Sequence, residues 1–153
     1  MAQRTFNGIA EVKAAEGEHL GYSEWLEMTQ DRIDKFAEAT GDYQWIHVDQ
    51  ERAKEGPFGT TIAHGYLTLS LASFFLPQIA EYEGFAMAIN YGVDKVRFVA
   101  PVLVGKRIRA GAEMMEVTDV KGGGIQTKVL ITIEIEGSEK PACVIESLSR
   151  WIP

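Results

Sequence analysis

The stretch YLTLSLASFFLPQIAEY, Tyr66 to Tyr82, decides the fold. Its apolar side chains fall on nearly every side of a helix axis, which is typical of a helix that is buried all round. Pro77 is expected to kink the last turns or to end the helix, because proline lacks the N–H that a helix interior needs. The stretch therefore predicts a buried central helix that other elements must cover.

The residues after this helix alternate in the manner of strands. Over residues 125–136, isoleucine and valine alternate with threonine and glutamate, which predicts a half-buried antiparallel strand. Further strands are expected over residues 85–90, 95–99, 106–117 and 141–151. Strands grouped in this way favour the α+β class, with one curved antiparallel sheet wrapped around the long central helix. We interpret residues 1–153 as a single domain, because the sequence shows no repeat or linker.

The residues before the central helix predict a bent helical segment. A strand is expected over residues 21–28, and Thr29 is the expected N-cap of a helix that Gly41 closes in the left-handed C′ position. Asp49 is the expected N-cap of a second, short helix that ends near Glu55. The stretch GDYQWIHVD, residues 41–49, therefore lies at a corner between two helices.

An acid and a histidine flank this corner. Asp42 and His47 are five residues apart, a spacing that separates two side chains in a regular helix and in a strand alike. The expected bend lets the two side chains converge. The pair then has the residue types of an acid/base site, although the same pattern also suits an ordinary surface loop.

The composition narrows the possible function classes. The chain has 153 residues, of which 46% are hydrophobic and 24% charged, as is typical of a soluble globular protein. The formal net charge of −7 argues against nucleic acid or a membrane surface as the main partner. The N-terminus lacks a signal-peptide pattern, and the most apolar segment is a poor membrane span. The single cysteine, Cys143, cannot form an internal disulfide, which suits the cytoplasm, and we interpret it as a core residue.

Two groups of residues raise the question of a bound ligand or metal. A run of basic side chains can bind a phosphorylated ligand, although a solvated rim of strand ends is the favoured interpretation. These residues are Lys95, Arg97, Lys106, Arg107 and Arg109. The three histidines are too dispersed in the sequence to indicate a metal site, so no metal is predicted.

Three motifs in order resemble the MaoC-like dehydratase family, which includes (R)-specific enoyl-CoA hydratases, and within it the nodulation protein N-like branch. The motifs are GDYQWIHVD, AHGYLTLSLAS and NYGVDKVRFVAPV. The resemblance implies the hotdog fold, a homodimer, and a catalytic pair in the pattern G-D-x-N-P-L-H. That pattern falls on Gly41, Asp42 and His47, with Gln44 and Trp45 where the family has Asn and Pro. This departure concerns the substrate range more than the chemistry.

Further residues are expected to bind the substrate. Gly65 begins the central helix, whose free N–H groups and dipole can stabilise negative charge on a thioester oxygen. The other expected substrate-binding residues are Gln44, His64, Ser73, Tyr91 and Gly92. A structural alternative exists for several of them. His64 can bond the loop backbone, Ser73 can be a small residue where helix meets sheet, and Tyr91 with Gly92 can form a strand kink.

The predicted function is reversible hydration of trans-2-enoyl-CoA to (R)-3-hydroxyacyl-CoA, by a hydro-lyase that uses no cofactor. Asp42 is the expected main base, and His47 is expected to hold the same water and to relay a proton. Two alternatives remain open at this point. One is a hotdog thioesterase that acts on the same thioester, and the other is a non-catalytic acyl-thioester binding protein.

Overall fold

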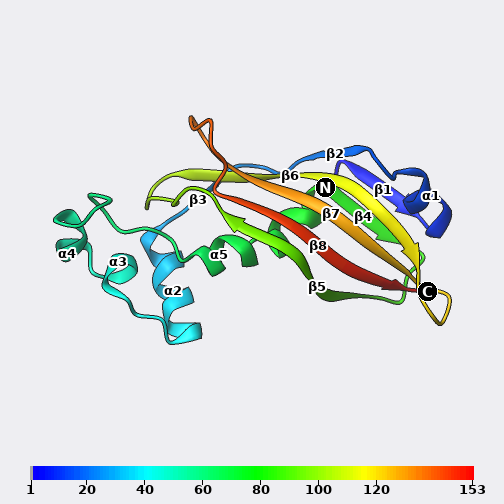
Figure 1. Ribbon diagram of the computed structural model, residues 1–153, viewed down its shortest axis with the longest axis horizontal. Coiled ribbons are helices and arrows are strands. Elements are labelled where there is room, and N and C mark those ends of the chain that lie inside the picture. The colour runs from blue at the N-terminus through cyan, green and yellow to red at the C-terminus, as the bar shows by residue number, and fades with distance from the viewer. Residues whose placement is uncertain (1) are drawn as a thin grey trace.

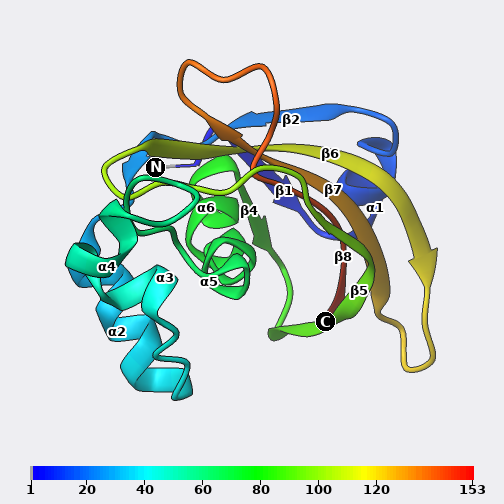
Figure 2. The ribbon, with the colours of Figure 1, turned by 60° about the vertical axis from the view of Figure 1, so that its left-hand side comes forward.

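The computed structural model describes residues 2–153 (Figure 1). Its main sheet has the strand order β2-β6-β7-β8-β5, and every pairing along it is antiparallel. The strands are β2 His19–Tyr22, β5 Met87–Phe98, β6 Arg107–Asp119, β7 Ile125–Ile135 and β8 Cys143–Ile152. The sheet curls around the helices α5, Gly65–Ser70, and α6, Ala72–Ile79 (Figure 2). This is the predicted α+β hotdog arrangement.

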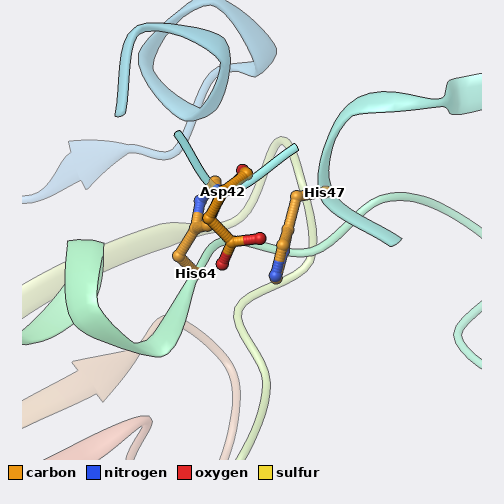
Figure 3. A group of neighbouring side chains, drawn as sticks. All are labelled: Asp42, His47 and His64. Atoms are coloured by element: carbon orange, nitrogen blue, oxygen red, sulfur yellow. The ribbon is translucent and has the colours of Figure 1, made fainter. Parts of the chain in front are cut away.

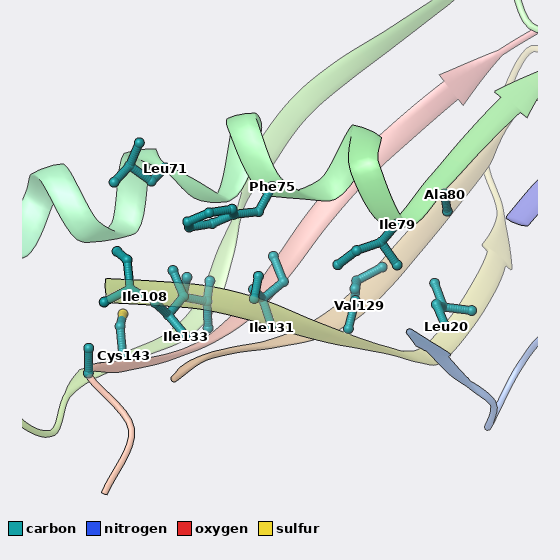
Figure 4. Packing of buried hydrophobic residues seen from close by; sticks show 14 of the residues in the cluster. Leu20, Leu71, Phe75, Ile79, Ala80, Ile108, Val129, Ile131, Ile133 and Cys143 are labelled. Atoms are coloured by element: carbon teal, nitrogen blue, oxygen red, sulfur yellow. The ribbon is translucent and has the colours of Figure 1, made fainter. Parts of the chain in front are cut away.

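The core lies between the central helices and the concave face of the sheet. Along β7 every second residue is buried, as the alternation in the sequence predicts. Phe75 and Ile79 point from α6 toward the sheet, and Leu71, between α5 and α6, is buried in the same cluster (Figure 4). They pack among apolar residues that include Ile108, Val129, Ile131, Ile133 and Cys143. Cys143 is fully buried, as expected, and burial raises the pKa of its thiol to about 11.

The prediction that the central helix is buried all round was wrong. The sheet covers one side of it, and on the other side Tyr66 is 70% and Phe74 49% exposed. The helix is also divided, since α5 ends at Ser70 and α6 begins at Ala72, and Pro77 lies inside α6 shortly before its end. The helix is apolar on all sides, but the single chain covers only one of them, so an apolar face stays exposed.

Strand β5 corrects a second prediction. The two strands expected at residues 85–90 and 95–99 are one strand, which pairs with β8 and shifts register between Asn90 and Gly92 and between Val93 and Lys95. The expected kink at Gly92 is therefore a β-bulge within a continuous strand. β5 lies at the edge of the sheet, and most of its residues are exposed.

The N-terminal region contains elements that the sequence patterns did not predict. β1, Arg4–Asn7, pairs in parallel with β4, Ala80–Glu83, and α1, Ile9–Ala14, follows β1. The strand expected at residues 21–28 is interrupted, because β2 ends at Tyr22 and β3 spans Leu26–Glu27. Between them the Ser23 hydroxyl accepts a hydrogen bond from the Ala110 N–H of β6, 2.9 Å, so a side chain continues the contact with the sheet.

Three short helices form the corner that precedes the central helix. They are α2, Gln30–Thr40, α3, Trp45–Val48, and α4, Gln50–Lys54. The predicted caps are confirmed: Thr29 accepts from the Arg32 N–H and Asp49 from the Arg52 N–H. Gly41 takes the left-handed conformation, with φ 79°, and ends α2. Among residues 2–153, no helix is long and apolar enough to cross a membrane.

Candidate active site

The end of α2 places Asp42 at the corner. After Gly41 the chain turns, and Oδ1 of Asp42 accepts a hydrogen bond from the backbone N–H of Gln44, 3.3 Å. This local bond closes the turn that leads into α3. Asp42 as a residue is exposed to solvent. Gln44 is also exposed, and it contacts Asp42 through its backbone N–H.

His47 is held in a defined orientation. It lies on α3 and is 7% exposed, and its Nδ1–H donates to the backbone carbonyl of Ile62, 2.7 Å. A carbonyl can only accept, so this bond leaves Nε2 with a free lone pair. The Gln30 amide donates to the backbone carbonyl of His47, 2.8 Å, and accepts from the hydroxyl of Thr61. Gln30 and Thr61 were missed by the sequence analysis, because only the tertiary fold brings them to His47.

His64 joins the pair. Its ring stacks on that of His47, with centroids 3.9 Å apart and planes at 23°, and its Nε2–H donates to the backbone carbonyl of Asp42, 3.0 Å. Phe36 contacts the ring as well, at 5.0 Å between centroids. Figure 3 shows the Asp42 carboxylate beside the His47 ring, with His64 next to both. Ligand atoms of the three side chains lie within 4.8 Å of one another. The structure therefore brings Asp42 and His47 together, and adds His64.

Burial controls the charge of His47. Desolvation lowers its pKa below the ordinary value, and the hydrogen bond to the Ile62 carbonyl acts in the opposite direction. The neighbouring His64 lowers the same pKa further, whereas the Asp42 carboxylate raises it. His47 is therefore neutral at neutral pH, with an unprotonated Nε2 next to a carboxylate. Such a pair can hold one water and accept a proton from it.

The same cluster bears on metal binding. The histidines were expected to be too dispersed in the sequence for a metal site, yet His47 and His64 converge on Asp42. Their rings are stacked, with centroids 3.9 Å apart and planes at 23°, so the two ring planes do not meet close to the nitrogen atoms. Nε2 of His64 also carries a proton for the Asp42 carbonyl. This geometry differs from that of a tetrahedral zinc site, whose ligands converge on the metal.

Gly65 directly follows His64 at the start of α5. The first helical hydrogen bonds run from the N–H groups of Leu67 and Thr68 to the His64 carbonyl, so the N–H groups of Gly65 and Tyr66 precede them. A Cβ at Gly65 would lie 3.2 Å from the ring of Phe98. The absence of a side chain at Gly65 therefore lets the Phe98 ring pack closely against the backbone. The sequence did not indicate a role for Phe98.

The remaining predicted site residues lie elsewhere. Ser73 and Gly92 line a cavity of about 770 Å³ between the central helix and β5, and the residues that line it do not include Asp42, His47 or His64. The Tyr91 ring is instead 3.7 Å from the guanidinium of Arg150.

The basic run that was considered for a phosphorylated ligand is partly paired. Arg107 binds Glu136 at 3.3 Å, and Arg109 binds Glu134 at 2.8 Å. Cross-strand ion pairs of this kind agree with the favoured interpretation of a solvated rim.

Comparison with known proteins identifies the family. A family model described as MaoC like domain matches residues 11–135. The chain is 52% identical to 3-hydroxyacyl-thioester dehydratase Z of Mycobacterium tuberculosis, over 97% of this chain and 99% of that protein. It is 45% identical to nodulation protein N of Rhizobium leguminosarum, over 94% of this chain and 88% of that protein. A monoamine oxidase regulatory protein from Archaeoglobus has a similar structure, with TM-score 0.81 and 26% identity over 99% of this chain and 97% of that one. The chain belongs to the MaoC-like dehydratase family.

Proposed function

We propose that the protein reversibly hydrates trans-2-enoyl thioesters to (R)-3-hydroxyacyl thioesters, with Asp42 and His47 as the catalytic pair. The observation that carries the proposal is the cluster in which a carboxylate lies beside a neutral, buried imidazole with a free Nε2, with ligand atoms of the two side chains within 4.8 Å. A relative with 52% identity is named as a 3-hydroxyacyl-thioester dehydratase, which favours this reaction.

The two groups divide the proton transfers. Asp42 takes a proton from a water as the water oxygen bonds to Cβ of the enoyl group, and the pair returns a proton to Cα. Nε2 of His47 accepts a hydrogen bond from the other hydrogen of the same water, which stays on the oxygen, and so orients that oxygen. The bond from Nδ1 to the Ile62 carbonyl holds the ring in the tautomer that this role requires. One proton leaves and one arrives, so the protein ends each cycle in its initial state.

The thioester oxygen gains negative charge while the water adds. We assign its stabilisation to the N–H groups at the start of α5, next to His64. The Phe98 ring lies against Gly65, so the thioester approaches these groups beside that ring.

We also propose that two copies associate along β5. The strand is an edge with unpaired backbone groups, and it carries Met87, 54% exposed, and Tyr91, 53% exposed. The exposed face of the central helix, with Tyr66 and Phe74, adds apolar area. A long apolar edge next to an uncovered helix face suits a second copy of the chain.

Loss of the enoyl absorbance of crotonyl-, octenoyl- and dodecenoyl-CoA tests the function directly. Asp42→Asn and His47→Ala should each lower the rate on the order of 10²-fold or more. Asp49→Asn is the matched control, because Asp49 is an acid in the same corner that caps α4 and asparagine caps a helix equally well. Hydration at the parent rate by both pair variants would refute the assignment. Release of free CoA in a thiol assay would instead indicate the thioesterase alternative.

A further inference from the structure

The cavity between the central helix and β5 has walls of two kinds. On the helix side it begins at Leu69, about one turn beyond Gly65, and continues past Leu76 and Pro77. Ser73 faces it from the helix, and at 1.5 Å per residue it lies about 12 Å from Gly65 along the axis. Polar side chains from three strands form part of the opposite wall. The cavity lies next to the proposed acyl-thioester site, and its polar groups can form hydrogen bonds that an unsubstituted alkyl chain cannot.

Three of these polar side chains form one row across the sheet. Asn90 of β5 pairs with Ser149 of β8, which pairs with Thr127 of β7, and all three line the cavity. We call these three residues the polar row. Two rows nearer to the Gly65 end, the concave face of the sheet is entirely apolar. The residues there are Val96, Ile145 and Ile131. Ile145 of this apolar row also lines the cavity, and so do Val93, Ser147 and Val129 of the row in between. The polar row therefore lies farther from Gly65 than the apolar part of the same wall.

The hydrogen-bonding capacity of the row is only partly used within the chain. Thr127 Oγ1 accepts from the indole N–H of Trp151, 3.0 Å. The Asn90 amide and the Ser149 hydroxyl remain to offer donors and acceptors to the cavity. An alkyl chain that displaced water from the half-buried Ser149 hydroxyl would leave it without a partner, which is costly, and would remove water from the cavity side of the exposed Asn90 amide. A chain with an oxygen atom at this depth would replace the lost hydrogen bonds.

The charge of the cavity narrows the class of ligand further. Glu81 is the charged residue among the described residues that line it. A carboxylate group on the acyl chain would meet a like charge and no basic partner. A neutral oxygen function matches an amide and a hydroxyl, each of which both donates and accepts.

We propose that this cavity holds the acyl group of the substrate, and that the polar row selects medium-length enoyl thioesters whose chain carries a neutral oxygen function such as a hydroxyl group. The inference rests on the proposed function, which it deepens by naming the substrate class. Asn90 and Ser149 are then specificity-determining residues. Asp42 and His47 perform the same chemistry on any chain that the cavity accepts.

The test compares pairs of substrates of equal length. Octenoyl- and dodecenoyl-CoA are assayed beside their ω-hydroxy derivatives and beside ω-carboxy derivatives. At the length that reaches the row, the ω-hydroxy thioester should have a kcat/KM about threefold to tenfold above the plain chain, as one hydrogen bond supplies. The ω-carboxy thioester should fall below both. Asn90→Leu and Ser149→Ala should each abolish the preference for the hydroxyl group.

Ser70→Ala provides the matched control. Ser70 lines the same cavity, but its hydroxyl already donates to the Tyr66 carbonyl, 2.6 Å, so its removal should leave the preference unchanged. Hydration of plain and ω-hydroxy chains at equal kcat/KM, at every length, would overturn the inference and leave the proposed function intact. If no thioester is hydrated, the proposed function fails. Titration calorimetry with the same thioesters then decides the inference separately, because equal Kd values for plain and ω-hydroxy chains would refute it.

Discussion

His64→Phe is expected to separate the stability of the protein from its activity. Phenylalanine keeps a flat ring in the position that stacks on His47 at 3.9 Å. It removes both ring nitrogens, of which Nε2 bonds the Asp42 carbonyl and Nδ1 is buried without a hydrogen-bond partner among residues 2–153. Since His64 is only 3% exposed, water does not replace what either atom loses.

The expected change in stability follows from these two atoms. Loss of the bond to Asp42 costs about 1 kcal/mol. Removal of a buried nitrogen that lacks a partner recovers about 1–3 kcal/mol of desolvation cost. The free energy of unfolding should therefore stay within about 1 kcal/mol of the parent value or rise by up to about 2 kcal/mol.

Activity should change in the opposite direction. Without the bond from His64, the backbone at Asp42 loses its link to the start of the central helix. A displacement of about 1 Å in a catalytic group costs on the order of 10²-fold in rate. Removal of His64 also removes an influence that lowers the pKa of His47. The acid limb of kcat/KM should therefore move to higher pH in the variant.

Urea unfolding and the enoyl-CoA assay, both followed across pH, measure these effects. His19→Phe is the control, because the His19 ring packs at a tilt against Tyr22, at 4.9 Å between centroids, and does not contact a member of the pair. A His64→Phe variant that is several kcal/mol less stable, yet retains the parent kcat and the parent acid limb, would refute the reasoning. In that case His64 would be a packing residue without influence on Asp42.

Three further predictions test the site and the assembly. Because burial lowers the pKa of His47, the parent kcat/KM should fall only below about pH 6.5, and a pH–rate profile with an acid limb above that value would contradict a neutral His47. Gln30→Ala should lower the free energy of unfolding by about 2 kcal/mol in urea titrations, since it leaves buried polar groups of two segments without partners, and an unchanged midpoint would count against this bridge. Tyr91→Lys on the edge strand should convert a dimer to a monomer in sedimentation velocity, whereas Met115→Lys, an exposed position on β6 within the sheet, should not.

Local rules predicted the corner well. The positions of Thr29, Gly41 and Asp49 follow from hydrogen bonds between residues three or four apart, so the sequence contains all the information that these caps need. The bend that lets Asp42 and His47 converge follows from them. The alternation in β7 is equally local, because burial of one face of a strand fixes its pattern.

Contacts between distant segments were not predictable in the same way. The carbonyl that orients His47 belongs to Ile62, in a loop without a motif, and Gln30 contacts His47 through an amide whose partner depends on the fold. The central helix shows the same limit. Its apolar residues indicate burial, but not whether the sheet of the same chain or a second molecule covers each side. β5 was divided in the prediction because its bulges interrupt the alternation.

The burial of Cys143 has a practical consequence. A thiol with a pKa near 11 inside the core is almost wholly protonated at neutral pH, and alkylating reagents need a thiolate that they can reach. A cysteine introduced at an exposed loop position, such as Ser138, would then be the reactive thiol of the chain. A fluorophore attached there would report substrate binding or subunit exchange, and Cys143 would not first have to be replaced.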